Sequence, residues 1–137
     1  MTQQDKELLL KDLCARLPYG VKLQQVSQSD TVFDLYSIDA NSLNLMFWKY
    51  KGKSLEIGDI GKLIRYGELK YKPYLRPMSS MTNKEKEDYH KLCDSYYDIY
   101  FDTVNSTDWL NEHHFDYRRL IEKGLAIKAE DGIYKTR

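Results

Sequence analysis

Three residues near the end of the chain have side chains that could bind a metal ion: His113, His114 and Asp116. His90 and Asp94, four residues apart, could contribute from a preceding helix. Imidazole and carboxylate groups are zinc ligands, and a zinc-bound water supports hydrolysis. Adjacent histidines on one helix point about 100° apart, so both bind one ion only where the helix breaks. The spacing therefore favours a core or cap-region histidine that donates to a backbone carbonyl, and the alternative is a metal-dependent hydrolase or nuclease.

Basic and aromatic residues alternate in the middle of the chain. This interleaving is typical of proteins that bind single-stranded nucleic acid, in which cations contact phosphates and rings stack on bases. The candidate binding residues are Lys49, Lys51, Lys70, Tyr71, Lys72, Tyr74 and Arg76, with Tyr50 as a further ring. A structural role is the other interpretation, in which the 12 tyrosines line the rim of a core and lysines keep a sheet edge soluble. We favour the structural role, because the formal net charge is zero.

The sequence shows no other pattern of catalytic residues. No serine lies in a GxSxG turn, and no base accompanies either cysteine. Cys14 and Cys93 lack CxxC spacing, and each falls on an apolar helical stripe, which predicts buried, reduced thiols. We therefore predict no catalytic residue, no bound metal and no cofactor.

Charge is unevenly distributed along the chain. Residues 49–76 contain eight basic and three acidic residues, whereas residues 85–116 contain nine acidic and two basic ones. Two surfaces of opposite charge are expected, and they suggest a macromolecular partner, a protein rather than a nucleic acid. No window approaches the roughly 18 apolar residues of a membrane span, and the N-terminus lacks a signal-peptide pattern. We expect a soluble, cytoplasmic protein that does not bind a membrane.

The predicted fold class is α+β, in a single domain over residues 1–137. A sheet part of about 1–70 and a helical part of about 82–137 are joined by a proline-rich connector, 71–81. Apolar periodicity predicts a helix over 3–17 and strands over Val21–Ser27, Thr31–Ile38 and Leu43–Tyr50 in an antiparallel meander, with a fourth strand at Leu55–Ile57. Residues 58–67 suggest one helical turn or a mobile loop. Thr82 and Glu85 form a capping-box pattern, which predicts a helix of four to five turns that Asn105 and Ser106 separate from the next.

The stretch from Asp108 to Lys128 allows two interpretations. In the favoured one it is a single helix whose end is a Schellman motif, with Gly124 in the left-handed position and Leu125 against Leu120. In the other, the chain breaks at Phe115 and Asp116 caps a second short helix, as in a helix-turn-helix with a wing. In both, LAI and GIY flank an Asp-Gly turn and predict a C-terminal β-hairpin.

Three blocks of the sequence resemble a known group of proteins. They are LCARLPYGV (13–21), KPYLRPMSSMT (72–82) and DWLNEHHFDYRRLIEKGLAI (108–127). They are similar to signature blocks of short uncharacterised proteins from gut bacteria and their phages, a family without a known activity. The family usually has glycine where this chain has Arg119, which argues against a regular helix over Tyr117–Ile121. The resemblance implies an accessory protein of a phage or mobile element, and the absence of a catalytic pattern together with the charge segregation favours a non-enzymatic binding protein.

Overall fold

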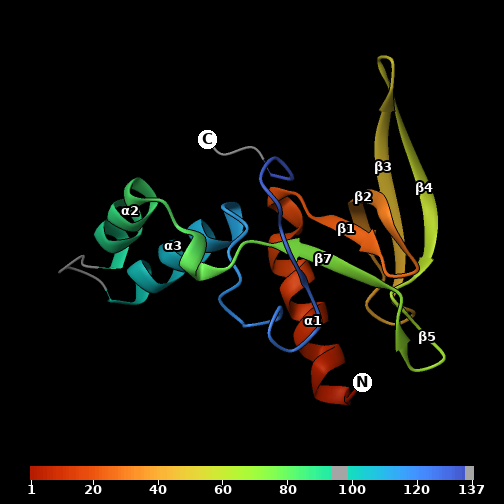
Figure 1. Cartoon of the computed structure of the whole chain (residues 1–137), viewed down its shortest axis with the longest axis horizontal. Helices are drawn as coiled ribbons and strands as arrows, with labels where there is room; N and C mark the ends of the chain where they lie inside the picture. The colour runs from red at the N-terminus through yellow and green to blue at the C-terminus, as the bar shows by residue number, and fades with distance from the viewer. Residues whose placement is uncertain (94–98, 135–137) are drawn as a thin grey trace.

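The computed structural model describes residues 1–93 and 99–134, and for 99–103 it describes the backbone alone. As expected, the chain is an α+β protein with an N-terminal helix, a mostly antiparallel sheet of six strands and two further helices (Figure 1). The helices are α1 (Gln3–Arg16), α2 (Asn83–Cys93) and α3 (Ile99–Glu112). The strands of the sheet are β1 (Lys22–Gln25), β2 (Gln28–Ile38), β3 (Asn44–Lys51), β4 (Ser54–Lys62), β7 (Tyr71–Leu75) and β8 (Ile127–Lys128). A separate hairpin contains β5 (Ile64–Arg65) and β6 (Glu68–Leu69).

Helix α1 begins at a capping box and buries one side against the sheet. Thr2 Oγ1 accepts the backbone N–H of Asp5 at 3.0 Å, and the Asp5 carboxylate accepts the N–H of Thr2. Leu9 and Leu13 are fully buried in the same core as the leucines of β1, β2 and β3. The prediction that Cys14 is buried is wrong, and so is the prediction for Cys93: both thiols are free and exposed. For Cys14 the reason is that the buried side of α1 also contains the polar residues Asp12 and Arg16.

The sheet has the strand order β4-β3-β2-β1-β7-β8. Strands β1 to β4 form the expected antiparallel meander. Strand β7 comes from the segment expected as a connector: it is extended, as predicted, but it lies inside the sheet beside β1. Pro73 lies opposite Leu23 of β1, and on the other side of β7 the strand β8 pairs with Tyr74 and Leu75 but does not reach Pro73. Proline has no N–H to donate, and β7 tolerates it because no strand pairs with Pro73 on the β8 side.

Residues 58–67 form neither a helical turn nor a loop, so that prediction is wrong. Strand β4 continues to Lys62, and β5 and β6 follow as a short hairpin. Tyr66 and Gly67 form its turn with φ values of 54° and 75°. Positive φ at both central positions is the geometry of a type I′ turn, which suits a two-residue hairpin.

Helix α3 runs through Asn105 and Ser106, so the predicted separation there is wrong. Asn and Ser cost only a few tenths of a kcal/mol in a helix, and packing overrides that preference. The helix instead ends at Glu112, and His114, two residues further along, has a φ of 65°. Phe115 N–H donates to Leu110 O at 2.9 Å, and His114 N–H donates to Asn111 O at 3.1 Å. These are the two hydrogen bonds of a Schellman motif, here with histidine in the left-handed position.

The favoured single helix over 108–123 is therefore wrong, and the chain breaks next to Phe115, as in the other interpretation. The break exists because Phe115 is fully buried, whereas a continuous helix leaves it off the apolar face. A second helix does not follow, since 117–124 consist of turns. The Asp116 carboxylate accepts the N–H groups of Leu120 and Ile121 at 2.8 and 3.0 Å.

The predicted Schellman motif at Gly124 is confirmed. Gly124 has a φ of 75°, Gly124 N–H donates to Ile121 O, and Leu125 N–H donates to Leu120 O at 2.9 Å. Leu120 and Leu125 are both buried. The predicted C-terminal hairpin is wrong: β8 pairs in parallel with β7, with Tyr74 opposite Ile127. Burying LAI in the main sheet removes more apolar surface from water than an isolated hairpin does.

Arg119 has a φ of 60°, a conformation that costs an L side chain roughly 1–2 kcal/mol and glycine little. Replacing Arg119 with glycine, the usual residue in the resembling family, is expected to raise the free energy of unfolding by about 1 kcal/mol. Urea denaturation measures this change. Lys123 lies in the same turn region outside the left-handed conformation, so Lys123→Gly is the matched control and is expected to destabilise. A lower stability for Arg119→Gly than for the wild type contradicts the prediction.

Candidate functional site

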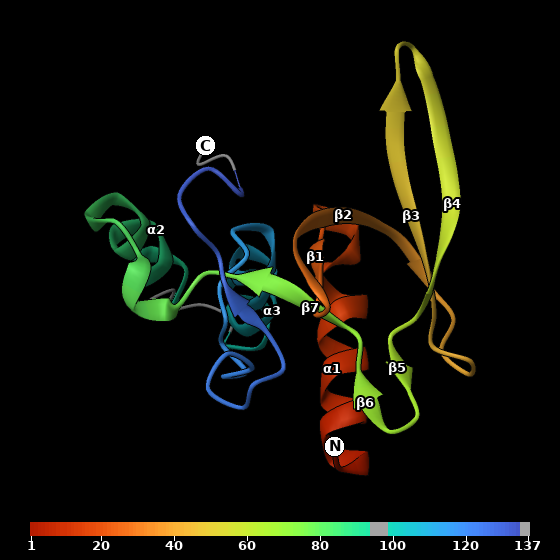
Figure 2. The same cartoon turned by 45° about the vertical axis from the view of Figure 1, so that its right-hand side comes forward.

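Strands β3 and β4 form a long hairpin that stands out from the rest of the chain, with β2 beside β3 (Figures 1 and 2). Its two-residue turn starts with Gly52, whose φ of 65° fits the first position of a type II′ turn. This turn follows the twist of the strands, so pairing starts with Lys51 opposite Ser54. The ladder continues without a shift to Phe47 opposite Gly58.

One face of the hairpin belongs to the core. The rings of Phe33 and Phe47 are 5.9 Å apart. The Phe47 ring also lies over Gly58, where a Cβ atom would come within 2.5 Å of it, so this close approach requires glycine. Lys49 and Glu56 face each other across the strands with their charged atoms 3.8 Å apart. Apolar packing and this ion pair therefore occupy this face.

The opposite face carries exposed apolar side chains. Trp48 is paired with Ile57 on β4 and with Asp34 on β2, so the three lie on one face. Residues two positions further along each strand lie on that face too. The exposed fractions are 43% for Val32, 66% for Tyr50, 49% for Leu55 and 43% for Ile57. We call Val32, Trp48, Tyr50, Leu55 and Ile57 the ribbon face.

The ribbon face has an ordered aromatic pair and a basic tip. The rings of Trp48 and Tyr50 meet edge to face at 5.5 Å, which holds Tyr50 in place although it is exposed. Lys51 and Lys53 at the turn have no ion pair within the residues that the structure describes. At the base, Lys22 and Asp34 pair at 2.7 Å. Among the described side chains, the charges near the aromatic pair that have no ion pair are the two lysines of the tip and Asp59, which lies opposite Met46 on the same face and accepts the N–H of Gly61.

The seven candidate nucleic-acid residues do not share one surface. Lys49 and Lys51 lie on the hairpin, whereas the other five lie on β7 or beside it. Tyr71 and Tyr74 are buried, so neither ring is available to stack on a base. The Tyr71 hydroxyl donates to Ile60 O at 2.5 Å. Burial raises the pKa of this phenol, and the nearby Asp59 carboxylate adds to the effect.

The cations near β7 are mostly engaged. Lys70 pairs with Glu68 at 2.9 Å, and Lys72 is half-buried. Arg76 donates to both carboxylate oxygens of Glu85, at 2.8 and 2.7 Å, and its guanidinium lies 4.1 Å from the centre of the Phe115 ring. Arg76 thus connects the basic segment to the acidic one inside the molecule, which partly neutralises the two surfaces of opposite charge.

Glu85 has two roles, because it also completes the predicted capping box of α2. The Thr82 N–H donates to its carboxylate at 2.9 Å, and Thr82 Oγ1 accepts the Glu85 N–H at 3.1 Å, which confirms that prediction. The hydrogen bonds from Arg76 are the main cause that lowers the Glu85 pKa to about 2. Glu85 is therefore a charged structural group across the ordinary pH range.

The histidine–aspartate cluster does not assemble into a metal site. His113 Nδ1 lies 2.9 Å from Trp109 O, and the two rings stack. The side chain is half-buried just after the end of α3, which fits a cap-region histidine rather than a core one. His114 stacks instead on Tyr134, with ring centres 3.6 Å apart. The Asp116 carboxylate is occupied by backbone N–H groups, and His90 is exposed on α2. Within 1–93 and 99–134 no group of three or more His, Cys, Asp or Glu could hold a metal ion, and Asp94 lies outside the described residues.

Burial and the positive charges of Arg16, Arg76, His113 and Lys22 lower the pKa of His114 to about 4. The unfolded histidine binds its proton near pH 6.5, so between pH 6.5 and 4 the unfolded chain binds more protons than the folded one. Stability is therefore expected to fall by about 2 kcal/mol as pH drops through this window, after allowance for solvent screening.

His114→Asn tests this expectation, since asparagine tolerates a positive φ and does not titrate. Urea denaturation at several pH values is expected to show that the variant loses the dependence between pH 6.5 and 4. The variant should still lose stability at lower pH, because the contribution of the Glu85 carboxylate to stability disappears as pH falls from about 4.5 towards 2. An unchanged profile between pH 6.5 and 4 contradicts the role of His114.

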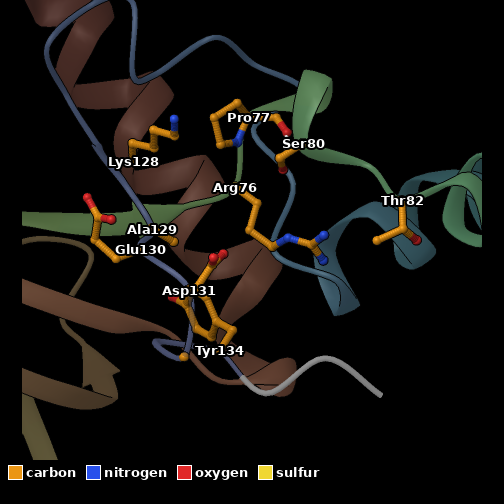
Figure 3. Close-up of a pocket in the computed structure, with 10 residues that line it drawn as sticks. Arg76, Pro77, Ser80, Thr82, Lys128, Ala129, Glu130, Asp131 and Tyr134 are labelled. Atoms are coloured by element: carbon orange, nitrogen blue, oxygen red, sulfur yellow. Dashed lines mark hydrogen bonds between the residues drawn. The ribbon is translucent and has the colours of Figure 1, made fainter.

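A polar cleft lies between the segment after β7 and the end of the described chain (Figure 3). It has a volume of about 450 Å³ and is lined by Arg76, Pro77, Ser80, Thr82, Lys128, Ala129, Glu130, Asp131, Gly132 and Tyr134. Arg76 points away from the C-terminal segment, towards Thr82, and it is held by Glu85. The lining has two positively charged side chains, Arg76 and Lys128, and two negatively charged ones, Glu130 and Asp131, so its formal charges balance.

A buried ionic cluster connects α1 to the C-terminal turns. Asp12 is fully buried and accepts from Arg16 Nε and from Arg118 Nη1, both at 2.8 Å. Arg16 is also buried, and its Nη2 donates to Phe115 O at 2.6 Å. Arg16 Nη1 and His114 Nδ1 are buried without a hydrogen-bond partner in the described part of the chain. This cluster fixes the break at Phe115 to the N-terminal helix.

Comparisons of the chain with protein-family models, with curated proteins and with solved structures give no match. In the described segments, no helix is both long and apolar enough to cross a lipid bilayer. The ribbon face is therefore the candidate functional surface. Sequence reasoning singled out Tyr50 and Lys51 but not Val32, Leu55 or Ile57. The sequence of β3 did indicate this surface, because the residues on both of its alternating faces are apolar and only one face can pack on the core.

Proposed function

We propose that the chain is a non-enzymatic binding protein whose ribbon face binds a partner protein. The observation that carries the proposal is that one face of the sheet has exposed aliphatic and aromatic side chains, with Tyr50, Leu55 and Ile57 on the projecting hairpin and Val32 on β2 beside it. A protein rarely exposes such a group except where it binds another molecule. Tyrosine and tryptophan are also the residues that most often dominate the free energy of binding at protein interfaces.

Three of the five residues support a protein over a nucleic acid as the partner. Val32, Leu55 and Ile57 are aliphatic and exposed, and they contribute neither charge nor a ring for stacking. Nucleic-acid binding needs several phosphate contacts, whereas the tip supplies Lys51 and Lys53. Aliphatic groups around an aromatic pair instead match the apolar centre of a protein interface, with the lysines at its rim.

The sequence resemblance adds a biological setting to this proposal. The three similar blocks suggest an accessory protein of a phage or mobile element, acting on a host or phage protein. A metal-dependent hydrolase receives no support from the geometry, because His113, His114 and Asp116 are each engaged elsewhere.

Replacing Tyr50 with alanine is expected to weaken partner binding at least about 30-fold, the effect of losing roughly 2 kcal/mol at an interface hot spot. The measurement is affinity capture by the tagged full chain from lysate of the producing cell, with quantitation of each recovered protein. The wild type is expected to recover a discrete protein after nuclease treatment, and Tyr50→Ala is expected to lose it.

Tyr66→Ala is the matched control, because Tyr66 is 92% exposed and lies on the separate β5–β6 hairpin. It should recover the same protein as the wild type, and its free energy of unfolding should lie within about 0.5 kcal/mol of the wild-type value. Tyr50→Ala also loses the ring pair with Trp48 and should cost about 0.5–1.5 kcal/mol. Equal recovery by Tyr50→Ala and Tyr66→Ala contradicts the proposal, and so does recovery that disappears with nuclease.

A further inference from the structure

Strand β4 is the outermost strand of the sheet, and one of its sides has no partner strand in the described chain. Lys51 and Ser54 flank a two-residue turn and form a hydrogen-bonded pair, and such pairs alternate along an antiparallel ladder. Ser54, Glu56 and Gly58 therefore hydrogen-bond to β3. The N–H and C=O groups of Leu55 and Ile57 consequently point outwards, towards solvent.

From Ser54 to Gly58 this edge lacks the features that usually protect edge strands; the β-bulge of β4, which is one such feature, lies beyond this stretch, where Met46 pairs with Asp59 and Leu45 with Gly61. Proteins block such edges with proline, lysine, inward-pointing charges or very short strands. Strand β4 has nine residues, with neither proline nor lysine before Lys62. Glu56 is the charge nearest the tip, and Lys49 neutralises it. At the other end of the sheet, β8 has only two residues.

The charges on this edge discriminate between occupants. Antiparallel pairing of β4 with β4 of a second copy about Ile57 places Lys62 beside the Lys53 tip, which brings like charges together. Pairing Leu55 with Ile57 instead brings Asp59 opposite Lys53, but it places the two Glu56 side chains directly opposite each other. A segment with acidic residues at the tip and apolar residues opposite Leu55 and Ile57 is instead complementary to it. Edge strands in other proteins bind extended peptides in this way, through backbone hydrogen bonds and alternate side chains.

Building on the proposed function, we infer that the partner supplies an extended segment that adds to β4 as an antiparallel strand. Its alternate apolar side chains extend the ribbon face beyond Leu55 and Ile57. Its acidic end lies beside Lys51 and Lys53. The backbone groups of Leu55 and Ile57 provide the hydrogen bonds that fix its register.

The probe for this inference is the capped peptide Thr-Val-Thr-Val-Thr-Val-Glu-Glu, whose valines fall opposite Leu55 and Ile57 when the glutamates reach the tip. Amide hydrogen exchange of the full chain, followed by NMR, reports on those two positions. The peptide is expected to slow exchange at Leu55 and Ile57 and to leave Tyr66 unchanged.

N-methylation separates an added strand from simple contact with the face. Methyl groups on the valine amides, which face β4, are expected to weaken peptide binding at least about tenfold. Methyl groups on the threonine amides, which face away, are expected to leave binding unchanged. Equal weakening by both sets overturns the inference, and so does the absence of protection with the unmodified peptide.

Ile57→Pro removes one outward N–H and should abolish peptide binding, and the methylated peptides provide the test should this variant not fold. A stable dimer of the wild-type chain that Ile57→Pro disrupts also overturns the inference, since a second copy then fills the edge. The two proposals fail separately. Failure to recover any protein through Tyr50 sinks the proposed function, whereas a recovered protein that leaves Leu55 and Ile57 exchanging freely sinks the strand addition alone.

Discussion

Replacing Asp12 with alanine is expected to lower the free energy of unfolding by about 3–5 kcal/mol, the usual result of removing one partner of a buried ion pair. Asp12 is the carboxylate that compensates both Arg16 and Arg118. Without it, the buried Arg16 guanidinium keeps only the carbonyl of Phe115. Urea denaturation followed by circular dichroism measures the change.

Lys11→Ala is the control for this experiment, because Lys11 is the exposed neighbour of Asp12 on α1, and it should change stability by less than about 0.5 kcal/mol. Exchanging Asp12 and Arg16 together for leucine and methionine should recover much of the loss, since an apolar pair avoids the desolvation of both charges. A loss below about 1 kcal/mol for Asp12→Ala contradicts the importance of the cluster.

Tyr71→Ala is expected to destabilise the chain by about 3–5 kcal/mol, as truncation of a large buried aromatic side chain usually does. The Tyr71 ring packs edge-on against Phe33, 6.1 Å between centres, and belongs to the main core. Thermal and urea denaturation measure the change. A tyrosine that stacked on bases would instead alter oligonucleotide binding and leave stability unchanged.

Two variants resolve this prediction further. Tyr71→Phe keeps the ring and loses only the hydrogen bond to Ile60, so it should cost about 1 kcal/mol. Tyr50→Ala removes an exposed ring that pairs edge to face with Trp48, so it should cost only about 0.5–1.5 kcal/mol. Similar stabilities for Tyr71→Ala and Tyr50→Ala would show that Tyr71 does not support the core.

The two Schellman motifs, at His114 and at Gly124, show which parts of the fold can be predicted from the sequence. Gly124 and His114 occupy the same left-handed position in Schellman motifs, each followed by a buried apolar residue, Leu125 or Phe115. Glycine signals that position by itself, because it alone adopts it at little cost. Histidine does so only where tertiary contacts hold it, here stacking on Tyr134, twenty residues further along the chain. The sequence therefore allowed a break at Phe115 as an alternative, but it could not favour the break over a continuous helix.

Long-range contacts also explain where the observed fold differs from the other sequence-based predictions. The pattern of β8 is that of any short apolar strand, and its parallel pairing with β7 depends on the position of a strand about fifty residues earlier. For the candidate site, alternation correctly predicted β3, and it placed Trp48 and Tyr50 on one face. Whether a helix covers that face is a property of the whole fold: α1 packs on the other side of the sheet.

Site-specific photo-crosslinking in the producing cell tests protein binding by the ribbon face most directly. A photoreactive phenylalanine derivative replaces Tyr50 in one version of the full chain and Tyr66 in another. Position 50 is expected to form an adduct of one defined mass that is sensitive to protease and insensitive to nuclease, and position 66 is expected to form none. A nuclease-sensitive adduct at position 50, or an adduct at position 66 alone, would contradict the binding of a protein by the ribbon face.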